Sequence, residues 1–442
     1  MSPNFLPCER DQQLLMPTDL REWLPDDHLA WFVLDAVSEL DLEPFYAAYR
    51  DDGWGRAAHD PPMMVALCLY AYATGERSAR RIERRCQEDI AYRVITANQV
   101  PDHSTIARFR ARHADQLADL FGQILGLCAK AGLVSVGTIA LDGTRIVANA
   151  ADSANRSYAQ LATEILAEAA RVDEAEDAEF GEARGDELPP ELADPNTRRA
   201  RLKEAKRRLD EEHAAKQAEM AAWERARANY TARTGLKKKG RPTKPRPIPP
   251  KETARINTTD PDSRPVKTAR GFIQGYTAQA VTTEEQVILA ADVISGGNER
   301  HRLRPMAKAA TAELERAGLE ERPEVALADA GYWNGSQIAA LEAEGIEVLV
   351  PPDADTRRAP SKIRRGGRYE RMRRRLAHPE AKELYRRRQQ MIEPVFAQIK
   401  NNLRAGRFSR RGLASCRAEW RLTAATHNLL KLYRSGLAGA GA

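Results

Sequence analysis

The stretch VGTIALDGTRIVA (residues 136–148) marks the point at which the chain changes from helical to β-rich character. Its apolar residues are largely β-branched, which favours a buried strand, and Gly143 permits a tight turn directly after Asp142. We therefore expect Asp142 to end a buried strand. A charged residue at such a place is costly to bury unless it is paired or bound to a metal.

A second stretch, PEVALADAGYWN (residues 323–334), is organised in the same way. A short apolar strand is predicted to end on Asp329, and Gly331 follows two residues later. A single aspartate at a strand end is more typical of a turn or a helix cap. Two of them in corresponding contexts favour a shared site. Tyr332 and Trp333 follow closely and have two interpretations, stacking on an unpaired base or packing in the core, of which packing is favoured.

The segments around these two strands give the order of a mixed sheet. The pattern predicts two further strands, a helix, the strand with Asp329, another helix and a last strand, at residues 271–282, 286–295, 302–317, 323–329, 335–345 and 346–352. This succession, interrupted after the strand with Asp142, predicts an α/β fold with a ribonuclease-H-like mixed-sheet catalytic core.

A long charged insertion is expected between the first strand and the rest of this core. Residues 158–230 are rich in Ala, Glu and Arg at helical period and are broken by an acidic, Pro-rich link at 181–195. This pattern predicts two long helices in an antiparallel hairpin. The stretch KKKGRPTKPRPIPPKE (237–252) that follows is expected to be a basic, Pro-rich loop.

The first 130 or so residues indicate several short helices that carry many arginines. They are compatible with a helix-turn-helix-like DNA reader in which Arg108 and Arg110 contact DNA. The alternative is a bundle used for packing or dimerisation, because any all-helical domain has a similar pattern.

The predicted division of the chain has four parts. These are a helical DNA-binding or dimerisation domain, the first part of the catalytic core, the charged insertion with its basic loop, and the second part of the core with basic C-terminal helices, at 1–132, 133–155, 156–265 and 266–435.

Charge is strongly segregated along the chain. The net charge is +6, yet residues 357–411 contain 19 Lys and Arg against 4 Asp and Glu. Such a basic region indicates binding to a polyanion. A solvated or disordered basic linker is a serious alternative for Arg357–Arg375, and a weaker one beyond Lys382, where apolar residues recur at helical spacing.

Composition argues against several classes of protein. No apolar run approaches the roughly 20 residues of a membrane-spanning helix, and the first residues lack the layout of a signal peptide, so we expect a cytoplasmic protein without a membrane partner. The five cysteines are scattered without a CxxC pair, which argues against a disulfide framework or a zinc site and favours buried, apolar thiols. Several acids near the predicted strands are candidates for a supporting role, namely Asp152, Asp292 and Glu299.

The stretch YRRRQQMIEPVFAQIK (385–400) supplies a third acid. Glu393 and Lys400 are seven residues apart and therefore lie on one helical face, two turns from each other. Pro394 removes a backbone donor, so we expect a kink or a new helix start at Glu393.

This stretch resembles the C-terminal signature of bacterial insertion-sequence transposases of the DDE class, in which Tyr, Arg, Glu and Lys share one helix. ALDGTRI around Asp142 and ALADAGYWN around Asp329 are similar to the first and second aspartate motifs of that family. The N-terminal helices, the strand pair after the insertion and the ending RFSRRGLASCRAEWRLTAATHNLLKL also resemble the family. The resemblance covers nearly the whole chain.

The resemblance implies that Asp142, Asp329 and Glu393 are catalytic acids that hold two Mg²⁺ or Mn²⁺ ions. Two such ions about 3.5–4 Å apart activate the attacking oxygen and stabilise the leaving oxygen, and hard ions prefer oxygen ligands. Residues implied in holding the DNA backbone are Tyr385, Arg387, Arg388, Lys400 and Arg404. Four residues separate Arg388 from Glu393 where the common signature has three, which leaves the choice among Arg386, Arg387 and Arg388 open.

The implied activity is cleavage and strand transfer at the terminal inverted repeats of an insertion sequence. The implied partners are double-stranded DNA, as element ends and target, and further copies of the chain in a homodimer or larger synaptic complex. Two alternatives stay open. One is a catalytically inactive DNA-binding remnant, and the other is a ribonuclease-H-like nuclease that hydrolyses DNA without joining it.

Overall fold

The computed structural model describes most of the chain, namely residues 19–49, 57–165, 167, 198–234, 251–353 and 366–440. Three sequence predictions fall wholly or largely outside these residues. They concern the link of the helical hairpin, most of the basic Pro-rich loop, and the N-terminal part of the basic segment 357–375.

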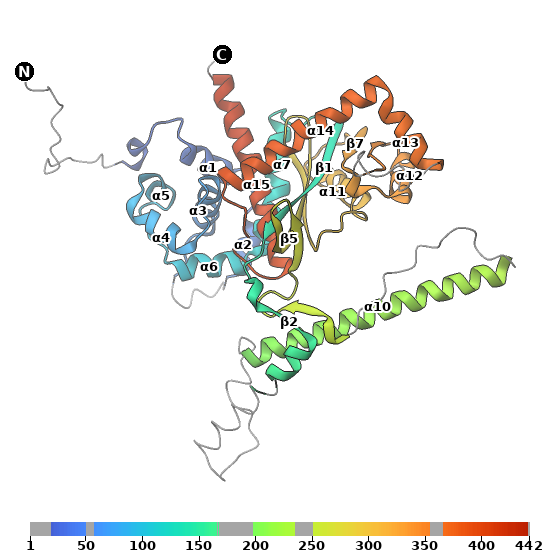
Figure 1. Cartoon of the computed structure of the whole chain (residues 1–442). Coiled ribbons are helices and arrows are strands. Elements are labelled where there is room, and N and C mark those ends of the chain that lie inside the picture. Colours follow the sequence, from blue (N-terminus) through green and yellow to red (C-terminus); the bar gives the residue numbers. More distant parts are fainter. Residues whose placement is uncertain are drawn as a thin grey trace, which may run out of the picture.

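Short helices form the N-terminal part of the structure (Figure 1). They are a 3₁₀ turn at Leu20–Trp23, α1 (Leu29–Ser38), α2 (Glu43–Tyr46), α3 (Pro61–Ala73), α4 (Ala79–Glu88), α5 (Ile90–Ile95), α6 (His103–Arg112) and α7 (Ala114–Lys130). Helix α3 is buried over almost its whole length and forms the centre of this part. It begins at a proline and is followed by Gly75 at φ +75°, the expected asymmetry of helix ends.

A six-stranded mixed sheet forms the centre of the described catalytic part. Its strands are β1 (Thr138–Val147), β4 (Arg264–Thr268), β5 (Gly271–Thr282), β6 (Ile288–Ser295), β7 (Val325–Ala328) and β8 (Glu347–Leu349). Strand β1 pairs antiparallel with β5 and parallel with β7, β6 lies on the far side of β5, and β8 lies beyond β7. The predicted ribonuclease-H-like mixed sheet is confirmed, with β4 as an edge strand that the sequence reading missed.

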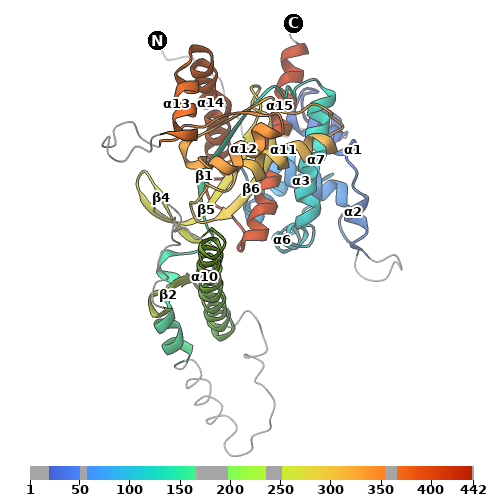
Figure 2. The same ribbon diagram turned by 90° about the vertical axis from the view of Figure 1, so that its right-hand side faces the viewer.

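Helices cover both faces of the sheet. They are α11 (Leu303–Arg316), α12 (Gly335–Ala343), α13 (Gly367–Ala377), α14 (Pro379–Ala397), a π-helical turn at Gln398–Asn402, and α15 (Leu413–Ala440). Helix α15 packs along α7 and β6 (Figure 2). The Asn428 side chain accepts from the N–H and donates to the carbonyl of Ile288, and Arg417 donates to the carbonyl of Val293. These bonds satisfy three backbone groups of β6, an edge strand that α15 covers.

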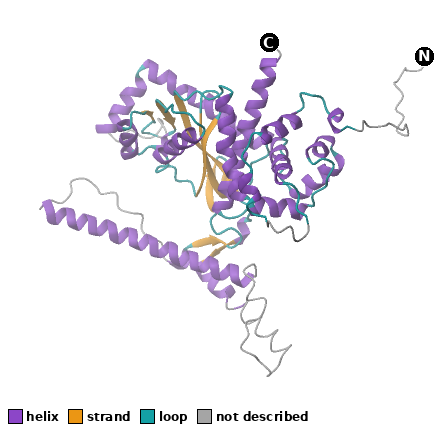
Figure 3. Ribbon diagram, turned by 180° about the vertical axis from the view of Figure 1, so that it is seen from behind, coloured by secondary structure: helices purple, strands orange, loops and turns teal. Residues whose placement is uncertain are grey.

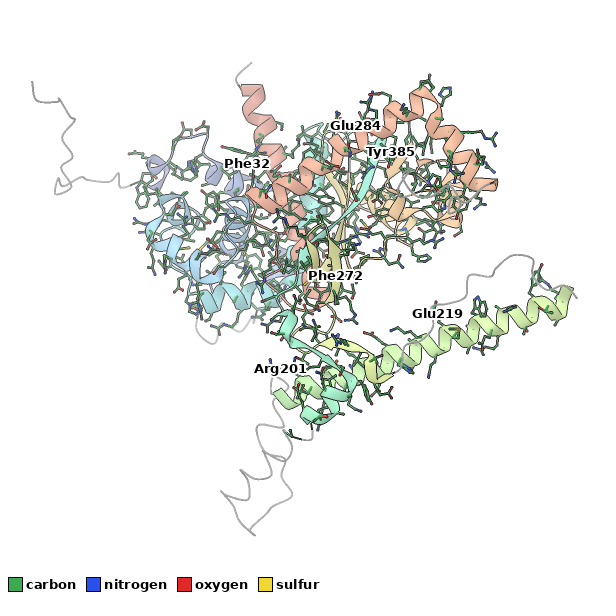
Figure 4. The ribbon with its side chains drawn as sticks, in the orientation of Figure 1. Phe32, Arg201, Glu219, Phe272, Glu284 and Tyr385 are labelled. Carbon is green, nitrogen blue, oxygen red and sulfur yellow. The ribbon has the colours of Figure 1, made fainter. Side chains whose placement is uncertain are left out.

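The insertion after β1 extends away from the sheet (Figure 3). A two-stranded ribbon of β2 (Asn155–Ser157) and β3 (Arg255–Asn257) connects it to the core, and its main helix is α10 (Arg198–Thr234). Leu161, Leu202, Leu209 and Ile256 form a small core of their own at the base of α10. The remainder of α10 is largely exposed and carries charged residues such as Glu219 (Figure 4). The long charged helix is therefore confirmed, while its partner is described only over residues 158–165 and 167.

The described cysteines are buried free thiols, and the two aromatic rings that follow Asp329 pack in the core. Cys68, Cys86, Cys128 and Cys416 are free and buried. Tyr332 is fully buried and accepts a hydrogen bond from Gln279, and Trp333 is 7% exposed. Core packing, the favoured interpretation of these two rings, is thus confirmed. No helix in the described ranges is both long enough and apolar enough to span a membrane.

Candidate active site

Strand β1 brings Asp142 beside Asp329. Leu141 is in register with Ala328 on the parallel neighbour β7, so the two aspartates occupy the next positions of adjacent strands. Asp329 follows the last residue of β7, as predicted, and its carboxylate accepts from the N–H of Gly331 at 2.9 Å. Neighbouring strands lie about 4.8 Å apart, so both carboxyl groups are on one small patch of the sheet.

Asp142 does not end its strand, which corrects the sequence prediction. β1 continues to Val147, and Gly143 lies inside the strand opposite Gln279 of β5. Gly143 is therefore not required for a turn, and its surroundings give another reason for a glycine here. A Cβ at this position would overlap the Oε1 atom of Glu299 and would lie 3.0 Å from the Thr277 methyl group. Gly143 is therefore needed for close packing and not for a turn.

The two aspartates influence each other electrostatically. Burial is the main cause that raises the pKa of Asp329 above its ordinary value, and the negative charge of Asp142 raises it further. The Gly331 N–H and the Arg388 guanidinium act in the opposite direction. Two carboxylates that share a partly desolvated site are costly in the absence of a cation. This environment suits a divalent ion.

Arg388 is the arginine of the signature that reaches these acids. Its Nη1 atom lies 2.8 Å from Asp142 Oδ2, and its side chain is only 11% exposed. The ring of Tyr385 lies 5.9 Å from the same guanidinium. Arg386 and Arg387 instead pair at the surface with Glu383 and Glu284. Figure 4 labels Tyr385 on α14 and Glu284 in the turn after β5. Of the three arginines among which the sequence left the choice open, Arg388 is thus the one that contacts Asp142.

Glu393 lies on the same helix but apart from the aspartates. It is exposed, and its side chain makes no ion pair or hydrogen bond with any residue in the described ranges. It follows Arg388 by five residues, which turns it about 140° around the helix and moves it about 7.5 Å along the axis. Within the described part of the chain, no three His, Cys, Asp or Glu side chains are arranged as a ready-made metal site. The predicted trio is therefore not preassembled.

Helix α14 passes through Pro394 without a new start, so of the two outcomes expected at Glu393 the restart is wrong, and the kink stays a prediction. A proline at this position cannot donate to the carbonyl of Gln390, four residues earlier. The side chain of Gln286 donates to that carbonyl at 2.9 Å instead. Thr282 Oγ1 also donates to the next carbonyl, that of Met391. Side chains from the β5–β6 region thus satisfy the backbone that the proline leaves open.

A double-mutant cycle tests whether the Gln286 side chain replaces the backbone N–H that Pro394 lacks. We expect Gln286→Ala to lower the free energy of unfolding by about 1 kcal/mol, the usual worth of one hydrogen bond. In a Pro394→Ala background, residue 394 supplies its own N–H, so the same Gln286→Ala change is expected to cost close to nothing. Urea unfolding of the four proteins measures the coupling. Equal costs in both backgrounds would contradict the assignment.

Lys400 lies in the π-helical turn that follows α14. π-helical turns often occur at functional sites. Lys400 is half-buried, and its pKa is lowered mainly by burial and further by the nearby charge of Arg145. Arg404 follows at φ +50°, is exposed, and packs its side-chain stem towards Gly75 of the N-terminal part. The surroundings of Lys400 are cationic and partly buried, which favours an anion such as a backbone phosphate.

The two N-terminal arginines proposed for DNA contact have different surroundings. Arg108 is exposed on α6, where it bonds only to Ser104 one turn earlier. Arg110 donates to the carbonyl of Arg77 at 2.9 Å. The guanidinium of Arg77 itself pairs with the buried Glu419 of α15. These contacts give Arg110 a structural role where the N-terminal helices meet the core, and they leave Arg108 available to a partner.

Arg145 and Glu299 form an ion pair beside the two aspartates, and the sequence did not indicate this pairing. Arg145 of β1 holds both carboxylate oxygens of Glu299, at 2.9 and 3.3 Å. Glu299 was recognised only as one of several nearby acids, and Arg145 was missed. The sequence holds one signal for the position of Glu299, namely a glycine one or two residues after each aspartate. Both Gly143 and Gly331 leave room for the Glu299 carboxylate.

The fold and the paired aspartates define a protein of the ribonuclease-H-like class. Comparison with family models gives two matches, to a "Transposase domain (DUF772)" over residues 18–112 and to a "Transposase DDE domain" over residues 250–429. The chain belongs to the DDE transposases of insertion sequences. It has no significant match among curated proteins or among solved structures.

Proposed function

We propose that the chain cuts DNA at the terminal inverted repeats of its own insertion sequence and joins the freed 3′ hydroxyls to target DNA. In this proposal Asp142, Asp329 and Glu393 hold two Mg²⁺ or Mn²⁺ ions. The observation that carries the proposal is the placement of Asp142 on β1 beside Asp329, directly after the parallel strand β7, where burial and the charge of Asp142 raise the pKa of Asp329. Membership of the DDE transposases supports it.

The donor set fits hard divalent ions, because carboxylate oxygens are the ligands that such ions prefer. When bound, the ions would activate the attacking oxygen and stabilise the leaving oxygen of an in-line displacement. The protein residues have separate tasks. Arg388 offsets the charge of Asp142 before the site is loaded, and then turns to the DNA backbone. Lys400 and Tyr385 orient the phosphate next to it. Glu393 approaches the aspartates when DNA and metal bind.

We further propose a homodimer or larger synaptic complex, because both ends of an element must be cut together. The protein would act on the nucleoid in the cytoplasm. The basic surfaces of α4, α6 and the C-terminal helices would hold DNA, by electrostatic contact with its phosphates.

One assay tests the proposal as a whole. Purified full-length protein is incubated with labelled element-end DNA, a plasmid target and Mg²⁺ or Mn²⁺. We expect joined products that disappear when EDTA removes the metal. Cleaved but unjoined DNA would favour a nuclease without strand transfer. DNA binding without cleavage at any metal concentration would indicate an inactive remnant.

The contrast between Arg108 and Arg110 gives a separate prediction for the N-terminal helices. We expect Arg108→Ala to weaken DNA binding and to reduce the slope of log K against log salt by about 1, the loss of one phosphate contact. Arg110→Ala is the matched control, because it removes one arginine of the same helix whose bonds are internal. It is expected to lower the melting temperature, which Arg108→Ala leaves unchanged. Binding curves at several salt concentrations decide the matter, and an unchanged slope in Arg108→Ala would remove this residue from the DNA surface.

A further inference from the structure

Glu299 occupies the space behind both aspartates. Its side chain is 8% exposed, and the carbonyl of the same residue accepts from the N–H of Arg302 at the start of α11. Its Oε1 atom takes the space where a Cβ on Gly143 would stand, and its Oε2 atom lies 3.3 Å from the corresponding position on Gly331. Asp329 Oδ1 lies 3.0 Å from that same position. The carboxylate is thus wedged between the strand of Asp142 and the turn after Asp329.

Arg145 holds this carboxylate on the face of the sheet opposite Asp142. Side chains alternate along a strand, so residues 143 and 145 of β1 lie on one face and residue 142 on the other. Arg145 donates to both oxygens of Glu299 and also to Thr277 Oγ1 at 2.8 Å. Thr277 in turn donates to the carbonyl of Gly296, in the loop that leads to Glu299. Arg145 is therefore fixed by three hydrogen bonds.

The pairing of Arg145 with Glu299 affects the net charge around the two aspartates. Asp142 already has one cationic partner, Arg388. Arg145 lies three residues from Asp142 on β1. Burial acts to lower the pKa of Arg145, but the charges of Glu299 and Asp142 help to raise it overall. Glu299 offsets Arg145 by a bidentate pair, which is the strong form of such an interaction. Without Glu299, the charge of Arg145 behind the two aspartates would be uncompensated, and together with Arg388 it would weaken the attraction for a divalent ion.

We propose that Glu299 is a positioning residue for the metal-binding aspartates, which acts by holding Arg145 and neutralising its charge behind Asp142 and Asp329. Glu299 does not itself coordinate metal in this proposal, because both of its oxygens are held by Arg145. The inference rests on the proposed metal-dependent function.

The experiment measures metal binding rather than turnover. Mn²⁺ is titrated calorimetrically into the full-length protein without DNA. We expect Glu299→Gln to weaken Mn²⁺ binding about 10- to 100-fold, as for other groups that orient metal ligands. We expect the double variant Arg145→Gln, Glu299→Gln to recover most of the wild-type affinity, because the competing cation is gone. In DNA cleavage, Glu299→Gln is expected to lower kcat with little change in KM for DNA.

Glu313→Gln is the matched control. Glu313 is a buried glutamate of α11 that pairs with Arg421 at 2.8 Å, and its side chain is 7% exposed. We expect it to lower the melting temperature while Mn²⁺ affinity stays at the wild-type value. This control separates loss of a buried ion pair from loss of the positioning role.

The possible results are distinct. Unchanged Mn²⁺ affinity in Glu299→Gln would overturn the inference and leave the proposed function standing. Weak binding in the single variant that persists in the double variant would also overturn it, because Glu299 would then be a ligand and not a positioning residue. A wild-type protein that binds no Mn²⁺ and shows no metal-dependent cleavage would overturn the proposed function itself.

Discussion

Replacement of Asp329 by asparagine is expected to abolish DNA cleavage and joining while making the metal-free protein more stable. The loss of activity should be at least about 10³-fold, the scale for removal of a principal charge-stabilising group. The gain in stability has a different cause. Burial and the charge of Asp142 raise the pKa of the Asp329 carboxyl, so the ionised form is disfavoured in the folded state. Asparagine has a similar shape and no charge to bury.

The sign of the pH dependence follows from the raised pKa. Above the folded-state pKa, the folded protein carries the cost of an ionised Asp329, and this cost disappears as the pH falls through that pKa towards the ordinary value of 3.8. The extra stability of Asp329→Asn should therefore be present at neutral pH and vanish in acid. Thermal melting in EDTA at several pH values tests this, and a lower melting temperature at pH 7 would contradict it. Added Mn²⁺ should reverse the order, since only the wild type gains stability from bound metal.

The sequence alone predicts the order of the strands and helices around the two aspartates. Apolar period and glycine positions predicted β1, β5, β6, β7 and β8 in sequence. The end of β1 was misplaced because glycine after an aspartate is a common turn signal, whereas here the glycine gives room to a side chain 156 positions later. Strand β4 was missed because its residues, RPVKT, include a proline and a lysine, which are unusual in a strand interior but acceptable at an edge.

The site was harder to predict than the fold because its geometry depends on tertiary contacts. Nothing local to Pro394 indicates that Gln286 supplies the missing donor, so a restart of the helix was the reasonable expectation. Similarly, Arg386, Arg387 and Arg388 are equivalent in sequence, and only the crossing of α14 over β1 selects the last of them for Asp142. Local patterns identify which residues have the right chemistry, while register and helix crossing decide which of them meet.

Replacement of Glu393 by glutamine is expected to lower DNA cleavage and joining as severely as the change at Asp329, by at least about 10³-fold. Unlike Asp329, Glu393 is exposed, and its side chain forms no ion pair or hydrogen bond within the described part of the chain. The substitution should therefore leave the melting temperature in EDTA unchanged. Glu383→Gln is the control. It alters an exposed glutamate of the same helix, one that pairs with Arg386, and should change neither activity nor stability.

The comparison of the two acid variants decides how the site is completed. Glu393 becomes a ligand in the proposed mechanism only when metal and DNA bind, so Glu393→Gln should weaken Mn²⁺ binding less in the free protein than Asp329→Asn does. On element-end DNA, the two variants should be equally inactive, because the transition state needs every charge that holds the ions. If Glu393→Gln cleaves DNA at the wild-type rate, the third acid lies elsewhere, and the helical signature does not supply it. Equal loss of activity, with stability altered only by the Asp329 change, would mean that two acids are built into the sheet and that the third is brought to them by α14.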